Sequence, residues 1–250
     1  MVTRNECAFC PGTANLSGEH LWSNWMRELF KSKKFRFRQR DEEGRVVNEW
    51  RSQAIDLTAK VVCKPCNEGW MSNLELRHAK PAMSDLIVGR KISSFSESRA
   101  SSIALFAFKS AVVIDRMRRD RQPFFRRSTR HAFARSLQIP DGVQMWLAGF
   151  LPMGSGRFNT YYGDLSVQGM GRLKLYVCTY AVGHFAFQVV AVRSTGIPSF
   201  SPRAGFEYIA VPFWPTIPDG ISWPPSEVMR TSTDFDKFSE RWGAISFVPE

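Results

Sequence analysis

Two cysteine pairs constrain the fold of this chain more than any other feature. Four of its five cysteines stand as Cys7-x-x-Cys10 and Cys63-x-x-Cys66. Thiolates at this spacing can occupy two corners of a tetrahedron, so two such pairs can together close a structural zinc site. We therefore predict that these four cysteines bind one Zn²⁺ and tie two distant segments of the chain together.

The cysteines could instead form two unrelated pairs or a redox dithiol. A redox pair normally opens a helix after a strand in a βαβ unit, and neither pair has that setting. Residues 11–62 form a longer gap than a zinc ribbon usually has, which predicts an insertion between the two knuckles.

Composition indicates a folded protein with a polyanionic partner. The chain has 250 residues, of which 44% are hydrophobic and 13% aromatic, and a formal net charge of +11. This excess favours nucleic acid first and an anionic membrane surface second. No apolar run is long enough to span a membrane, and the first residues show no secretory signal. We expect a cytoplasmic protein with reduced thiols and no membrane partner.

The order of patterns along the chain predicts an α+β fold. A serine-rich stretch, residues 92–102, reads as a loop and suggests a boundary between a module at 1–91 and a domain at 92–250. The expected elements of the first part are a helix within residues 21–34, a hairpin at 34–51, a strand at 55–62, and a helix from Cys66 that ends before Pro81. The second part is expected to hold an apolar helix at 103–120, then β-rich runs and a short helix near the end.

A zinc ion held by four cysteines has no free position for a substrate, so catalysis must come from other residues. Glu19-His20 follows the first knuckle, and Asn67 follows the second directly. If zinc joins the knuckles, these three residues come close together. On their own, His20 could be an ordinary surface or core histidine, and Asn67 could be a helix N-cap.

The motif SGEH after the first pair, with CKPCN and a helix at the second, resembles the zinc-stapled branch of the HNH (ββα-metal) endonucleases. The likeness covers about residues 5–80. In its layout, this segment is similar to phage endonuclease VII and McrA-type restriction nucleases. It implies that His20 is a general base and that Glu19, where the family usually has Asp, binds a catalytic Mg²⁺ or Mn²⁺. It further implies that Asn67 is a second ligand or orients the histidine loop.

Many members of that family carry a third His or Asn farther along the helix. Asn73, Glu75 and His78 are the candidates here, and the sequence does not choose among them. The chemistry suits hydrolysis of a phosphodiester, because a neutral imidazole can deprotonate water near neutral pH. A hard cation held by oxygen ligands can neutralise charge on the phosphate, separately from the sulfur-bound zinc.

Two arginine-rich segments are candidates for contact with phosphates, although charge runs are usually solvated faces. The first, in the expected hairpin, places Arg36, Arg38 and Arg40 on one face. The second lies within residues 116–135. Its candidate nucleic-acid-binding residues are Arg118, Arg119, Arg126 and Arg127.

The sequence thus supports three hypotheses. The first is a metal-dependent endonuclease that cuts or nicks DNA, preferred to RNA because the resembled family acts mostly on DNA; restriction and phage defence are compatible roles. The second is a zinc-stapled nucleic-acid-binding protein without turnover. The third is a subunit whose C-terminal half binds a partner protein or a ligand. A homodimer through that half is left open.

Overall fold

The computed structural model describes residues 6–12, 16–31, 34–118, 121–151, 155–167, 171–193, 200–202, 204–216, 221–239 and 245–249. The first part of the chain forms β1 (Leu16–His20), η1 (Asn24–Leu29), β2 (Phe35–Arg40), β3 (Val46–Ser52), β4 (Thr58–Cys63), α1 (Lys64–Cys66), η2 (Asn67–Met71), η3 (Leu74–Ala79) and α2 (Lys80–Ile87). The remainder forms α3 (Glu97–Met117), α4 (Arg127–Ser136), β5 (Val143–Phe150), β6 (Gly156–Val167), β7 (Gly171–Val182), β8 (Phe185–Val192), β9 (Val211–Trp214), β10 (Val228–Met229), α5 (Ser232–Phe238) and β11 (Ile245–Pro249).

A large, mostly antiparallel sheet organises the fold, which confirms the mixed α+β class. Within the described residues it has nine strands, in the order β10-β5-β8-β7-β6-β11-β2-β3, with β9 also paired to β5. Strands β5 and β8 are almost wholly buried because both faces of the sheet are covered there. Met145 and Leu147 of β5 pack in one core cluster, while Trp146 and Ala148 pack in a second one. This alternation follows from the two-residue period of a strand.

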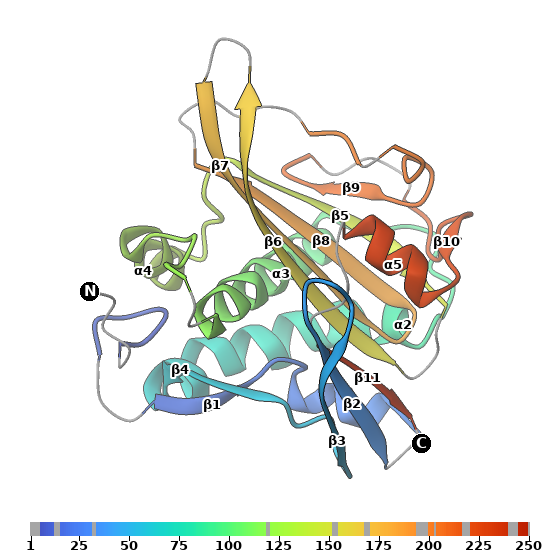
Figure 1. The fold of residues 1–250 in the computed structure, drawn as a ribbon, viewed down its shortest axis with the longest axis horizontal. Helices are drawn as coiled ribbons and strands as arrows, with labels where there is room; N and C mark the ends of the chain where they lie inside the picture. The colour runs from blue at the N-terminus through green and yellow to red at the C-terminus, as the bar shows by residue number, and fades with distance from the viewer. Residues whose placement is uncertain are drawn as a thin grey trace.

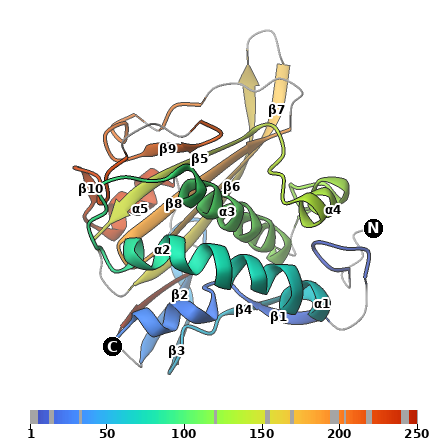
Figure 2. The same ribbon diagram turned by 180° about the vertical axis from the view of Figure 1, so that it is seen from behind.

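Helices cover the two faces of the sheet differently. Helix α3 and the continuous helical segment from α1 to α2 lie on one face, as Figure 2 shows, and α5 lies on the other face in Figure 1. Helix α3 is apolar on nearly every side because it lies between the sheet and the helix that runs from α1 to α2. Its first turn is capped by Ser96, whose Oγ accepts a hydrogen bond of 3.2 Å from the backbone N–H of Arg99.

A second, two-stranded sheet consists of β1 and β4, which pair antiparallel with Glu19 opposite Ala59 and His20 opposite Thr58. The chain continues from Cys63, the last residue of β4, directly into the helical segment α1–α2. The small sheet and this segment lie side by side next to α3 in both views (Figures 1 and 2).

The predicted hairpin is present as β2–β3, and the structure shows where it packs. Strand β2 pairs with β11 near the C-terminus, with Phe37 opposite Phe247. Phe35 and Phe37 are buried in the core cluster that also contains α3 and the central strands. The segments 1–91 and 92–250 therefore share a sheet and a core, while a functional boundary between them stays a prediction.

Three sequence-based boundaries were wrong. The helix after Cys66 does not end before Pro81 but runs to Ile87, because Pro81 lies in the first turn of α2, after π-helical turns, where its missing N–H is tolerated. The stretch 92–102 is a loop only up to Ser96, whose capping bond starts α3 at Glu97. The helix expected within residues 21–34 is a short 3-10 helix, Asn24–Leu29.

Candidate active site and metal centre

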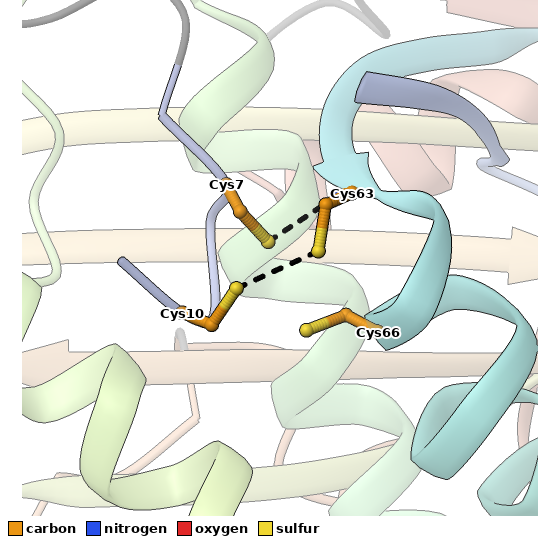
Figure 3. A group of neighbouring side chains, drawn as sticks. All are labelled: Cys7, Cys10, Cys63 and Cys66. Carbon is orange, nitrogen blue, oxygen red and sulfur yellow. Dashed lines mark hydrogen bonds between the residues drawn. The ribbon is translucent and has the colours of Figure 1, made fainter. Parts of the chain in front are cut away.

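The four predicted cysteines form one cluster. Their sulfur atoms all lie within 4.8 Å of one another, and none of the four is in a disulfide. In Figure 3, Cys7 and Cys10 project from the N-terminal loop toward Cys63 at the end of β4 and Cys66 in α1. Sulfurs at ~2.3 Å from a tetrahedral zinc are ~3.8 Å apart, so small movements close the site. The cluster can therefore hold a structural metal such as zinc.

Backbone N–H groups already point at these sulfurs. Phe9 and Cys63 donate to the Sγ of Cys7 at 3.4 and 3.3 Å, and Gly12 donates to the Sγ of Cys10 at 3.4 Å. Such bonds favour thiolates and orient metal ligands. Four thiolates in so small a volume repel one another, so the ionised form of the cluster needs a bound cation.

Burial and hydrogen bonding act in opposite directions on the thiols. Burial raises the pKa of Cys10 and of Cys66. Burial also opposes ionisation of Cys63, but the backbone N–H of Cys66 and the thiols of Cys10 and Cys7 outweigh it, so the pKa of Cys63 lies below its ordinary value. Cys178, the fifth cysteine, is buried in β7, as its apolar surroundings predict.

Arginines of α3 and α4 hold the first knuckle in place. Arg130, which is buried, donates to the backbone carbonyl of Ala8, and Arg116 donates to that of Glu6 at 3.2 Å. Arg127 forms an ion pair of 2.6 Å with the Glu6 carboxylate. Burial, aided by the charge of Arg116, lowers the pKa of Arg130 to about 10. Part of the arginine-rich segment 116–135 is therefore structural.

The second knuckle connects to β1 through Asn67. The Nδ2 of Asn67 donates to the Oγ of Ser17 at 3.1 Å and to the carbonyl oxygen of Gly18 at 3.3 Å. These bonds join residues about fifty positions apart, immediately before Glu19 and His20. The helix N-cap interpretation of Asn67 is wrong, because Cys63 occupies the N-cap position of α1.

A cleft of about 960 Å³ opens beside this junction. Glu19, His20 and Asn67 all line it, so the structure brings the three predicted residues to one cavity. The Nδ1 of His20 is buried with no hydrogen-bond partner in the part of the chain that the structure describes. The remaining residues of the lining are Asn24, Trp25, Arg27, Glu28, Phe30, Phe35, Gln53, Ala54, Glu68, Ser72, Glu75, Leu76 and Lys80.

Glu19 has a partner that was not anticipated. Its Oε1 accepts a hydrogen bond of 2.8 Å from the Nζ of Lys109, and the same ammonium donates to Glu75 at 2.6 Å. Burial raises the pKa of Glu19, and the charge of Lys109 opposes that shift. Burial alone would lower the pKa of Lys109, but the two carboxylates reverse this and hold it above its ordinary value. Lys109 is therefore an ammonium ion inside the core.

This contact distinguishes among the three candidates along the helix. Glu75 lines the cleft and joins Glu19 through Lys109. Asn73 and His78 are exposed and are not among the residues described as lining the cleft. Lys109 itself was missed. The available signal was a lysine in the otherwise apolar run LFAFKSAVV, where a charge needs a buried partner.

The basic residues divide between two places. Arg36, Arg38 and Arg40 share one face of β2, opposite the buried Phe35 and Phe37, as the alternation predicts. Arg38 forms an ion pair of 2.6 Å with Glu49 of β3. In the second segment, Arg126 and Arg127 are exposed and Arg118 is half-buried. Arg119 lies outside the described residues.

Within the described residues, no helix has the length and apolar character needed to cross a membrane. Comparison with protein-family models, with curated proteins and with solved structures finds no match to this chain.

Proposed function

We propose that this protein is an endonuclease that hydrolyses phosphodiester bonds in DNA, with His20 as the general base. The observation that carries the proposal is the convergence of Glu19, His20 and Asn67 on one cleft beside a four-cysteine cluster. A strand pair followed by a helix, β1–β4–α1, has the element order of the resembled ββα-metal nucleases. This likeness supports the HNH assignment, which remains a proposal.

His20 suits the role of general base on chemical grounds. A neutral imidazole can accept a proton from an attacking water. The His20 side chain lines the cleft, and its buried Nδ1 lacks a partner among the described groups. The bond from Asn67 to the Gly18 carbonyl fixes the strand two residues before His20. This favours an orienting role for Asn67, one of the two that the resemblance implies.

A catalytic Mg²⁺ or Mn²⁺ is the finer part of the proposal. Lys109 donates to the Oε1 of Glu19, and Asn67 uses its Nδ2 to donate to Ser17 and Gly18, so the second carboxylate oxygen of Glu19 and the Oδ1 of Asn67 could bind a metal ion. These hard oxygen donors fit Mg²⁺, which commonly takes one or two carboxylates together with water and phosphate oxygens. When bound, the ion would neutralise charge on the scissile phosphate.

The hairpin face is the stronger candidate for a DNA-binding surface. Phe35, at the start of β2, and Gln53, just after β3, line the cleft, so the end of the hairpin that carries Arg36 lies beside the cleft. A DNA backbone that enters the cleft could continue along this strand. The exposed α4 arginines are farther along the chain, and Arg127 is already paired with Glu6.

A second candidate is a nucleic-acid-binding protein without turnover. The observation in its favour is the Glu19–Lys109 pair, because it gives Glu19 a structural role that needs no catalysis. Under this alternative, the zinc site and the basic face remain and the cleft is inactive.

The two candidates are separated by incubating supercoiled plasmid with wild-type protein or His20→Ala in Mg²⁺, Mn²⁺ or EDTA. We expect nicked or linear DNA from wild type with a divalent ion, and none from His20→Ala or in EDTA. His78→Ala, an exposed histidine outside the cleft, is the matched control and should cut like wild type. Equal binding of DNA by all variants without cutting would select the non-catalytic alternative.

A further inference from the structure

Lys109 stands in a place where a lysine needs a specific reason. It lies in the middle of α3 among buried apolar residues, and its side chain is 2% exposed. Burying an ammonium without partners is very costly, so its contacts decide what it does. Unlike its two carboxylate partners, Lys109 is not among the described residues that line the cleft.

All directions of its ammonium group are used. Glu19 accepts at 2.8 Å and Glu75 at 2.6 Å, and the Nζ lies 4.9 Å from the centroid of the Phe106 ring, within the range of a cation–π contact. Glu19 belongs to β1 and Glu75 to η3, so one side chain of α3 connects three elements. Without it, the carboxylates of Glu19 and Glu75, which both line the cleft, would lie close together with no cation between them and would repel.

His20 follows Glu19 directly in β1. Glu19 turns inward to Lys109, and both Glu19 and His20 line the cleft. On the preceding residue, the carbonyl of Gly18 is held by Asn67. The backbone that carries His20 is thus held by an amide from the second knuckle and by an ammonium from α3.

We propose that Lys109 is a positioning residue of the cleft: by joining Glu19 to Glu75 it holds β1 against the helix and sets the placement of His20. This inference rests on the proposed function for its activity readout only. It gives the segment after residue 92 a part in the site. The described residues that line the cleft come from before residue 92, whereas the ammonium group of Lys109 that holds two of them comes from α3.

The test compares wild type with Lys109→Met, which keeps the length of the side chain and its contact with Phe106 but removes the charge. We expect the single-turnover rate of plasmid cleavage to fall at least about 100-fold, while DNA affinity changes less than about twofold and zinc content is unchanged. Ser110→Ala is the control, since its buried hydroxyl has no hydrogen-bond partner among the described groups and its loss should not change the rate. A Lys109→Met variant as fast as wild type would overturn the proposal.

Hydrogen exchange separates this inference from the proposed function. In Lys109→Met, the amides of β1 and of residues 67–79 should exchange faster, whereas those of β7 and β8 should not. The expected exchange pattern does not depend on whether the protein cuts DNA. Wild-type protein without activity would therefore refute the proposed nuclease function but not the positioning role of Lys109. Unchanged exchange in β1 would refute the inference itself. If Lys109→Met does not fold, Glu75→Gln, at a position 16% exposed, removes one arm only and should give the same pattern with a rate loss of about tenfold.

Discussion

The four-cysteine cluster and the Glu19–Lys109–Glu75 triad have the same structural role but use different groups, thiols in the first and ion pairs in the second. Each joins segments that are far apart in sequence, and each lies next to β1 or β4. The cysteines come in two local pairs, and their Cys-x-x-Cys spacing predicts a metal site. The triad draws one residue from each of three elements and has no spacing rule. The comparison shows that one site can be held together both by a motif that is recognisable in the sequence and by a contact that is not.

The largest effect is expected from breaking the cluster. Cys63→Ser should lower bound zinc from about one to almost none per chain and lower the free energy of unfolding by about 5 kcal/mol or more, because metal binding is coupled to folding. Metal analysis and thermal unfolding measure both. Cys178→Ala, which lies outside the cluster, should keep its zinc. Full zinc in Cys63→Ser would contradict the shared site.

Breaking the triad should come next. Lys109→Met leaves two buried carboxylates without their cation, and removal of one partner of a buried pair costs about 3–5 kcal/mol. Urea unfolding of Lys109→Met and Ser110→Ala at neutral pH measures the difference. A cost below about 1 kcal/mol would mean that water already compensates Glu19 and Glu75.

The same variant has a predicted pH dependence. Burial raises the pKa of Glu19 in the folded state, so protonation favours the folded state and the stability from this group is lost as pH rises through that pKa. Removing Lys109 takes away an opposing charge and raises the pKa of Glu19 further. We therefore expect the destabilisation of Lys109→Met to be larger at pH 7 than near pH 5, as unfolding curves at the two values would show. A cost independent of pH would contradict an ionised Glu19.

A smaller effect is expected at the link between the two regions. Asn67→Ala removes the hydrogen bonds to Ser17 and Gly18 and should cost about 1–2 kcal/mol of stability. Asn73→Ala, an exposed asparagine on the same helix, should cost under about 0.5 kcal/mol. Similar losses in both variants, measured by urea unfolding, would show that Asn67 adds nothing specific.

The smallest effect concerns the basic face. Arg38→Ala should weaken DNA binding several-fold and reduce the slope of log affinity against log salt by about one, as expected for one lost phosphate contact. Fluorescence anisotropy at several salt concentrations measures this. Arg172→Ala, at the distal end of the β6–β7 hairpin where Arg172 pairs with Asp164, is the control. Equal losses in both variants would indicate non-specific attraction.

Much of the architecture could be predicted from local patterns. The alternation of Phe35 and Phe37 with arginines predicted β2, and the turn after it predicted the hairpin. The pairing of β2 with β11 could not be predicted, since a hairpin does not specify which distant strand pairs with its free side. The helix past Pro81 was missed because π-helical turns leave no reliable periodicity.

The candidate site divides in the same way. Cys7, Cys10, Cys63 and Cys66 have a spacing set by the coordination geometry of one ion, so the residues alone determined that cluster. The placement of Glu19, His20 and Asn67 at one cavity followed from it. The identity of the cation beside Glu19 was decided only by tertiary structure, because a buried charge takes its partner from whatever packing brings within about 3 Å, and α3 supplies Lys109 from ninety residues away.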